Sequence, residues 1–438
     1  MTTRRDILLH AILPGIGGML GVSLYVLGDT MIVGRGLGAA GLTALNIAIP
    51  MINVLNAIGL LFGIGGATLI SKALGEGRQE AANRLFTASL LLTGATGILL
   101  TFLFMVFLEP LCRFLGASEA AFPMVKDYLG IFLAFSLPFL LFSAGTALVR
   151  NDNGARLVMG AMLAGSIFNV VFDYVFIFHL GMGMGGAALA TGLAPCLGLA
   201  VLSSHYIRRR NLLKPNFKAL SPRRFARVVA AGTGSFVLEL SSGIIIFAFN
   251  LVILRLAGDV GVSSYSIVAN LALIITAVFL GTALGIQPLI SFHEGAGNQA
   301  MIQKVFRLGM RVALALGCFF TLLGLAFPRF LASLFITDAA VMAYAVTGIR
   351  LFFLAFPLMG MNIVWTMKHQ SRNHIKTALS VSLFRGLVFL LASLLLMSAL
   401  FGMTGVWLSL PVTELACFLI LLWLARREKK KAVKPSTS

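Results

Sequence analysis

Residues 41–86 read GLTALNIAIPMINVLNAIGLLFGIGGATLISKALGEGRQEAANRLF, and residues 261–306 read GVSSYSIVANLALIITAVFLGTALGIQPLISFHEGAGNQAMIQKVF. The two stretches lie 220 residues apart and share, without a gap, a Leu-Ile-Ser-x-x-x-Gly-x-Gly-x-Gln run that begins at Leu69 and at Leu289. Apolar composition alone gives scattered coincidences rather than an ordered run, so the chain is built from two related halves. Duplicated hydrophobic halves are typical of secondary transporters.

The composition predicts a membrane protein. Of the 438 residues, 59% are hydrophobic and 11% are charged, whereas a soluble domain carries about 25% charged residues. A water-soluble fold is therefore excluded, and the absence of period-two alternation argues against an outer-membrane barrel. We predict an all-α integral membrane protein with twelve transmembrane helices in two pseudo-symmetric six-helix bundles. The helices are expected near residues 8–33, 41–71, 87–108, 124–146, 155–179, 184–206, 229–254, 262–290, 306–328, 343–367, 377–400 and 404–425.

One hydrophilic stretch divides the chain. The predicted domains are an N-terminal six-helix lobe (1–206), a cytoplasmic basic linker (207–228), a C-terminal six-helix lobe (229–425) and a cytoplasmic basic tail (426–438). Because six is an even number, both lobes enter the membrane in the same orientation. They should be related by an axis along the membrane normal, with a cavity between them.

The basic residues predict the orientation. The net charge is +19, and most of the 34 Lys and Arg residues lie in the N-terminus, the loops after even-numbered helices and the tail. This asymmetry follows the positive-inside rule rather than indicating a nucleic-acid partner. We therefore predict a multi-pass protein of the plasma membrane (the bacterial inner membrane) with both termini in the cytoplasm.

The sequence lacks the signatures of several other classes. The four cysteines, at positions 112, 196, 318 and 417, lie far apart without a CxxC pair, so no metal site or disulfide framework is indicated. No Walker A motif is present, which argues against an ATP-driven engine on this chain. No nucleophile–base pair or metal cluster is visible at membrane depth, so we expect neither an enzyme nor a cofactor.

Five polar residues in the N-terminal lobe form the main candidate site. Asp29 and Asp173 fall in the outer halves of the first and fifth predicted helices, and buried acids normally face a cavity or a partner. Asn169 lies one turn from Asp173, and Thr191 and Tyr128 lie at similar depths. Two carboxylates in a low dielectric need a proton or a cation, so the pair either takes a proton or holds Na⁺ with help from Asn169 and Thr191. The alternative is interhelical hydrogen bonding alone.

The first two helices carry further candidates. Asn46, Asn53 and Asn56 form a polar stripe on one face of the second helix, which either lines a substrate cavity or holds neighbouring helices. Pro14 removes a backbone hydrogen bond in the first helix. It therefore creates either a static kink or a point at which the helix bends during transport.

Single acids lie near the middle of two helices of the C-terminal lobe. We expect Glu239 and Glu414 to face the substrate cavity, with a role in substrate or ion binding. Arg385 either pairs with Glu414 or extends its side chain to the cytoplasmic surface.

With these residues in place, the chain resembles the multidrug and toxic compound extrusion (MATE) transporters over nearly its full length. The resemblance is carried by Pro14, Gly28-Asp29 and Val33-Gly34, the Leu69-Ile70-Ser71-x-x-x-Gly75-x-Gly77 run, Arg150-x-x-x-Gly154, Asn169-x-x-x-Asp173-Tyr174 and Gly185-x-Ala187-Ala188-Leu189-Ala190-Thr191. It implies two six-helix bundles around a V-shaped cavity that export organic cations against inward H⁺ or Na⁺.

The resemblance also implies roles for individual residues. Asp29, Asn169, Asp173 and Thr191 match the ion-coupling positions of the N-terminal lobe, which would be the site of any Na⁺, and Tyr128 matches the associated tyrosine. Glu239 resembles the acid of the seventh helix. Residues 343–367 contain no Asp or Glu, so the acid found in the tenth helix of some branches has no counterpart.

The sequence thus favours a cation-coupled antiporter, using H⁺ or Na⁺, that exports lipophilic and often cationic compounds. Its expected partners are small organic substrates and membrane lipids, and we expect it to act as a monomer. The alternative is a flippase for lipid-linked oligosaccharide from the same superfamily. A flippase would need cationic groups facing a pyrophosphate, and Arg385 is the mid-membrane residue that favours it.

Overall fold

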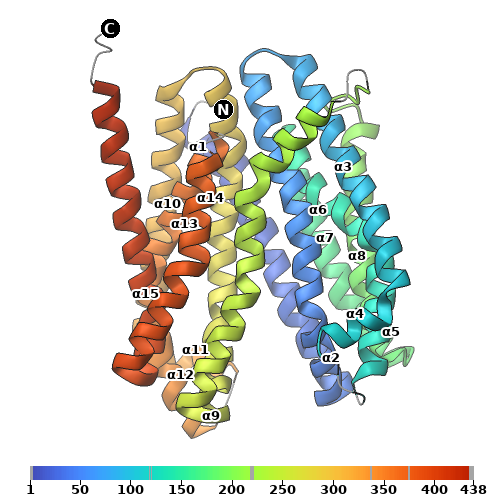
Figure 1. Ribbon diagram of the computed structural model, residues 1–438, viewed down its shortest axis with the longest axis vertical. Helices are drawn as coiled ribbons and strands as arrows, with labels where there is room; N and C mark the ends of the chain where they lie inside the picture. Colours follow the sequence, from blue (N-terminus) through green and yellow to red (C-terminus); the bar gives the residue numbers. More distant parts are fainter. Residues whose placement is uncertain are drawn as a thin grey trace.

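The computed structural model describes residues 3–117, 119, 121–217, 221–335, 338–372 and 375–433. Residues 218–220 of the predicted linker and 434–438 of the predicted tail lie outside the described residues. Within the described ranges, every regular element is a helix (Figure 1). They are α1 (Arg4–Ile7), α2 (Leu13–Gly75), α3 (Gln79–Val106), α4 (Leu108–Phe114), α5 (Phe122–Ala134), α6 (Ser136–Asn151), α7 (Ala155–Tyr174), α8 (Gly183–Ile207), α9 (Pro222–Gly295), α10 (Gln299–Ala326), α11 (Pro328–Ser333), α12 (Ala339–Phe352), α13 (Phe356–Ser371), α14 (Ile375–Leu383) and α15 (Phe389–Val433), with short π or 3-10 turns at Leu8–Ile12, Val175–His179, Phe353–Ala355 and Phe384–Val388.

Three of these helices each consist of two spans joined at a glycine. Gly38 in α2, Gly258 in α9 and Gly402 in α15 have φ values of 66°, 59° and 56°, a region that residues with a Cβ rarely adopt. Gly38 and Gly258 lie 220 residues apart, so this break recurs in both halves of the repeat. In α15 the two arms run antiparallel, since the Ser393 hydroxyl donates to the Ser409 carbonyl oxygen at 2.9 Å.

The spans agree with the predicted twelve. Ten helices of the described residues are long and apolar enough to cross a membrane, and the bent pair of α5 and α6 makes eleven. One of the ten, Leu379–Trp423, contains the reversal at Gly402 and therefore supplies two spans. The predicted continuous helix 124–146 is wrong in one respect, because α5 and α6 are bent by 56°. Pro138 explains the break, since it lacks the N–H that would bond to the Ala134 carbonyl.

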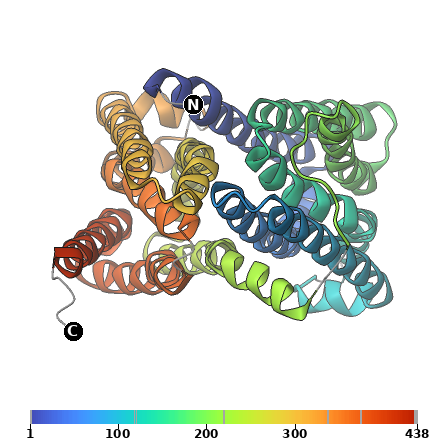
Figure 2. The same ribbon diagram turned by 90° about the horizontal axis from the view of Figure 1, so that it is seen from above.

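The helices form two bundles. Seen from above, α3–α8 lie on one side and α10–α15 on the other, with α2 and α9 between them (Figure 2). Each bundle has its own core: Leu55, Tyr128 and Phe132 pack in the first, and Phe279 and Trp407 in the second. The outward faces expose large apolar side chains, as a hydrocarbon environment requires, including Ile98, Phe102, Phe114, Phe319, Leu322 and Leu395.

The two bundles meet at the end of the molecule where α1 begins and α15 ends. There the backbones of α2 and α9 approach without intervening side chains: a Cβ built on Gly75 would lie 1.8 Å from the Phe292 carbonyl oxygen, and one on Gly295 would lie 1.8 Å from that of Lys72. Gly75 and Gly295 are related by the 220-residue repeat, so this contact is pseudo-symmetric. Toward the opposite end the two bundles diverge (Figure 1).

Buried side-chain hydrogen bonds join the bundles at the same level. Asn151 at the end of α6 accepts a hydrogen bond from Ser71 and donates to Gln287 of α9 at 2.9 Å. Gln287 in turn donates to Thr68 at 3.3 Å, and Ser291 donates to the Ser371 carbonyl at 3.0 Å. Closure at this end therefore combines backbone contact with a polar network that spans both bundles.

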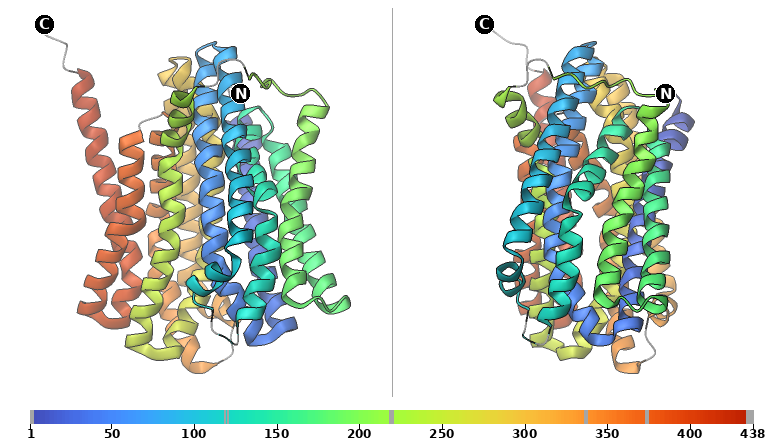
Figure 3. Two further views of the ribbon diagram at one scale, coloured as in Figure 1. Left: turned by 45° about the vertical axis from the view of Figure 1, so that its right-hand side comes forward. Right: turned by 90° about the vertical axis from the view of Figure 1, so that its right-hand side faces the viewer.

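The connection between the bundles is fastened to the first one. Its Leu212 N–H donates to Asp152 at 2.9 Å, and its Lys214 and Asn216 N–H groups donate to Asn83 and Thr87 at 3.0 and 2.7 Å. The segment runs along the end of the molecule that carries the termini (Figure 3). These bonds hold the described part of the linker against α3 and the end of α6.

Candidate functional site

The structure brings the five N-terminal candidates together inside the first bundle. Asp29 comes from the first span of α2, Tyr128 from α5, Asn169 and Asp173 from α7 and Thr191 from α8, and all five are buried. With its amide oriented to satisfy both atoms, Asn169 donates to Asp173 Oδ2 at 3.1 Å and accepts from the Thr191 hydroxyl at 3.2 Å. The i, i+4 spacing on α7 places the amide and the carboxylate on one face.

The two acids face each other. Their carboxyl groups are close enough to share a hydrogen bond when one of them is protonated. Three oxygens of this cluster, Asp29 Oδ1, Asp173 Oδ1 and Tyr128 Oη, are buried without a hydrogen-bond partner in the described part of the chain. Buried polar atoms are normally satisfied, so the unpartnered oxygens fit a site for a proton or a small hard cation. No group of three or more His, Cys, Asp or Glu side chains suited to a metal occurs among the described residues.

A cavity of about 460 Å³ lies between the bundles and touches this cluster from one side. Its volume falls in the usual range for a small-molecule site. Asn169 and Thr191 line it, whereas Asp29 and Asp173 do not. The acid pair therefore lies behind the cavity wall, and Asn169 contacts both the cavity and Asp173. Tyr25, one turn before Asp29, also lines the cavity.

The polar stripe of the second helix contributes to the cavity only at its deepest residue. Asn56 lines the cavity, but the predicted cavity residues Asn46 and Asn53 do not. Depth accounts for Asn46, which lies ten residues earlier on the helix than Asn56, about 15 Å along its axis. Asn56 donates to Glu239 at 2.9 Å across the two bundles.

Both predicted acids of the C-terminal lobe line the cavity, but their environments differ. Glu414 forms a bidentate ion pair with Arg385, at 2.8 and 3.0 Å, and accepts a further bond from Asn362 at 2.7 Å. Of the two alternatives for Arg385, the structure shows the pairing. A guanidinium that is bidentate to a carboxylate neutralises it, whereas no ion pair to Glu239 is found among the described residues.

The first span contains an irregularity at the predicted bending point. Residues Leu8–Ile12 form a π-helical turn directly before Pro14. The wider turn accommodates the missing backbone hydrogen bond, and the span Arg4–Gly38 continues through it. Gly15, beside the proline, lies against Gly281 of α9, where a Cβ would be 2.2 Å from the carbonyl oxygen. The predicted bending point therefore lies where the two bundles touch.

Comparison with known proteins decides the family. The MatE family profile matches residues 14–175 and 235–395, one copy in each half of the chain. The chain belongs to the MatE family. As a MatE protein it is a multi-pass membrane transporter and not an enzyme, as the sequence predicted.

Individual relatives agree with this assignment. The multidrug export protein MepA of Staphylococcus aureus (strain MRSA252) is 24% identical over 430 residues, covering 96% of this MatE chain and 93% of MepA. A crystal structure of MATE in complex with MaL6 superposes with a TM-score of 0.92 at 22% identity, covering 97% and 96% of the two chains. A structure described as the outward-facing conformation of a multidrug resistance MATE family transporter gives a TM-score of 0.91 at 22% identity, covering 98% and 97%. At these identities the superpositions establish the fold.

Several polar residues that line the MatE cavity fall outside the predicted site, among them Tyr25 and Arg150. Tyr25 could have been found from its i, i+4 relation to Asp29. Arg150 lines the cavity from the last turn of α6. In the sequence it lies beside a loop, where a basic residue indicates the orientation of the chain in the membrane. Its burial, at 5% exposed, becomes visible only in the fold.

Proposed function

We propose that this chain is a cation-coupled antiporter that exports lipophilic organic cations by alternating access. The observation that supports this most directly is the acid pair behind the cavity wall, joined to the cavity through Asn169. An ion at the pair and a substrate in the cavity would then influence each other through one bundle. Such coupling requires that each ligand favours a different state of the protein.

The cavity chemistry suits a lipophilic cation. Glu239 supplies a negative charge at the wall, and Tyr25, Phe139 and Phe142 supply aromatic faces. Aromatic rings attract cations in a desolvated site. Neutralisation of Arg385 by Glu414 removes the observation that favoured a flippase for an anionic pyrophosphate. MepA, a multidrug export protein by name, is consistent with this substrate class.

The coupling ion is H⁺ or Na⁺, held by Asp29 and Asp173, with Asn169, Thr191 and Tyr128 completing the site. Protonation or Na⁺ binding removes the repulsion between the carboxylates and lets the first and fifth spans approach. Bending near Pro14 would then shrink the cavity on the N-terminal side and release the substrate outward. Substrate binding should therefore weaken as the pair takes up protons, or as Na⁺ rises.

The experiment that tests this function uses proteoliposomes loaded with the ethyl ester of rhodamine B, a lipophilic cation without an acid group. Dye movement against its gradient should stop when either the pH gradient or the Na⁺ gradient is dissipated. The gradient whose loss stops the dye identifies the coupling ion. Dye movement that responds to neither gradient rejects antiport.

Glu239→Gln should weaken the apparent affinity for the cationic dye by about tenfold, as expected when a favourable charge interaction of about 1.4 kcal/mol is lost. The dependence on the ion gradient should persist, because the acid pair is intact. Initial rates as a function of dye concentration measure this. Glu119→Gln changes an exposed acid remote from the cavity and is the control. An unchanged affinity would remove Glu239 from the substrate site.

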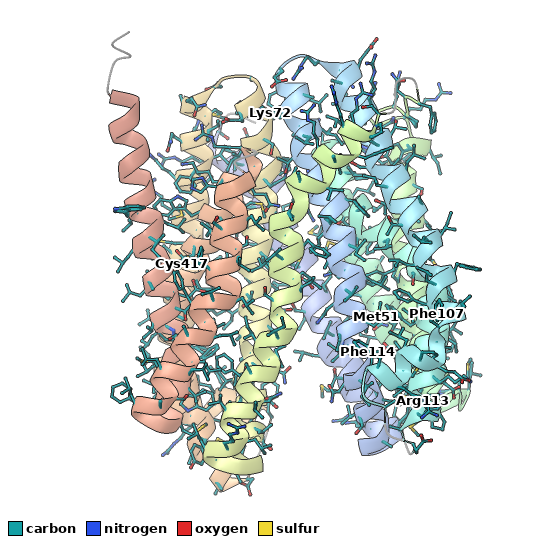
Figure 4. The ribbon with its side chains drawn as sticks, in the orientation of Figure 1. Met51, Lys72, Phe107, Arg113, Phe114 and Cys417 are labelled. Atoms are coloured by element: carbon teal, nitrogen blue, oxygen red, sulfur yellow. The ribbon has the colours of Figure 1, made fainter. Side chains whose placement is uncertain are left out.

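The orientation is also proposed. Lys72 lies at the end that carries the termini and Arg113 at the opposite end (Figure 4), and the positive-inside rule places the more basic end in the cytoplasm of a bacterial inner membrane. A single cysteine introduced at Asn211, in a cysteine-free background, should resist a membrane-impermeant maleimide in intact cells. It should react after the cells are opened. Labelling in intact cells would reverse the orientation.

A further inference from the structure

Arg150 is a buried cation at the wall of the substrate cavity. It lies in the last turn of α6, is 5% exposed and lines the cavity. Within the described part of the chain, no ion pair or hydrogen bond joins its guanidinium to another residue. The nearest acid in sequence, Asp152, is already engaged by His205 and by the Leu212 N–H.

The other charged groups that line the cavity have partners. Glu414 is paired with Arg385, and Glu239 accepts from Asn56. Gln370 occupies the position 220 residues after Arg150, and it exchanges hydrogen bonds with Ser235 at 2.8 and 3.2 Å. The repeat thus places a satisfied amide in the C-terminal bundle and an unpartnered cation in the N-terminal one.

Burying a charge without a partner costs desolvation free energy, so a group of opposite charge is expected to offset that cost when the site is occupied. The carbonyl end of α6 offers part of that compensation through the helix dipole. The remainder suits an anion, because the planar guanidinium matches a carboxylate with two parallel hydrogen bonds.

We propose that Arg150 forms an anion-binding subsite in the cavity and recognises the carboxylate of amphoteric lipophilic substrates. This inference rests on the proposed export function, with Glu239 taking the cationic end of the same molecule. The separation of the two subsites follows from α6: Ser143 contacts Asn56, the partner of Glu239, and lies seven residues before Arg150. Seven residues of helix span about 10 Å, so the two subsites lie at different levels of the cavity.

The test compares two probes that differ in one group. Rhodamine B carries a carboxylate and a delocalised cation, whereas its ethyl ester carries the cation alone. Equilibrium binding of each dye to the purified protein is followed by fluorescence anisotropy for the wild type, Arg150→Gln, Arg150→Lys and the exposed control Arg307→Gln. Arg150→Gln should weaken binding of the acid by about 10- to 100-fold, the range expected for losing a charged hydrogen bond, and leave the ester unchanged.

Arg150→Lys should retain part of the preference for the acid, since it keeps the positive charge but cannot make two parallel hydrogen bonds to a carboxylate. Arg307→Gln should bind both dyes as the wild type does. Binding of the ester serves as the measure of folding in the same sample. Equal losses for both dyes, or no loss for either, would overturn the subsite, as would a wild type that does not bind the acid. Transport of the ester tests the export function separately, because the ester has no carboxylate for Arg150 to bind. A failure of the export function is therefore distinguishable from a failure of the subsite.

Discussion

Asp173→Asn should reduce gradient-driven efflux of the cationic dye to the level of vesicles without protein, and Asp29→Asn should do the same. A gradient of one pH unit is worth about 1.4 kcal/mol, enough to hold a roughly tenfold ratio of a monovalent cation in one-for-one exchange. Without a carboxylate at either position the pair cannot take up its ion, so the ratio should fall to about one. The measurement is dye accumulation in proteoliposomes at a fixed imposed gradient.

Asp127→Asn is the matched control, since this exposed acid lies next to Tyr128 but outside the cluster. Both variants of the pair should still bind the dye at equilibrium, with binding that no longer responds to pH or Na⁺. If the two variants keep wild-type accumulation while Glu239→Gln loses it, coupling lies in the C-terminal bundle instead.

Gly232→Ala should arrest the transporter with the two bundles parted at the end that carries the termini. A Cβ at this position would lie 1.9 Å from the Leu61 carbonyl oxygen, a backbone atom that cannot rotate away. Overpacking of a close contact costs about 1–3 kcal/mol, enough to invert a balance of similar size between two states. Transport should fall by at least about tenfold.

Gly243→Ala is the control on the same helix, because nothing lies within 4 Å of the added Cβ. Spin labels at Phe114 and Leu334, both exposed at the diverging ends of the bundles, should report a shorter distance in Gly232→Ala than in the wild type or in Gly243→Ala. A cysteine-free background is needed for this labelling. Unchanged distances together with unchanged transport would show that the glycine contact does not control closure.

Much of the fold could be predicted from the sequence because it rests on long-range regularities. Twelve apolar segments and the 220-residue repeat each depend on many positions, so local irregularities do not disturb them. The bend between α5 and α6 lies beside a single proline, Pro138. The joining of two spans at Gly402 likewise depends on one residue, and neither residue stands out in a glycine-rich and apolar chain.

The candidate site divides in the same way. Asp29 and Asp173 are conspicuous because acids are costly at membrane depth, and the fold brings them face to face. Which residues reach the cavity depends on how the two bundles are inclined to each other, which no local pattern encodes. For this reason Asn56 lines the cavity while Asn46 and Asn53 do not, and Arg150, beside a loop in sequence, is buried at the cavity wall.

The fastened linker sets a limit on how far the bundles can separate. Its last described bond to the first bundle is at Asn216, and α9 of the second bundle begins at Pro222. The backbone from Asn216 to Pro222 makes six residue steps and reaches at most about 20 Å when fully extended. While Asn83 and Thr87 hold the linker, its length sets the largest distance by which the two bundles can move apart at this end. A longer linker would allow a larger opening.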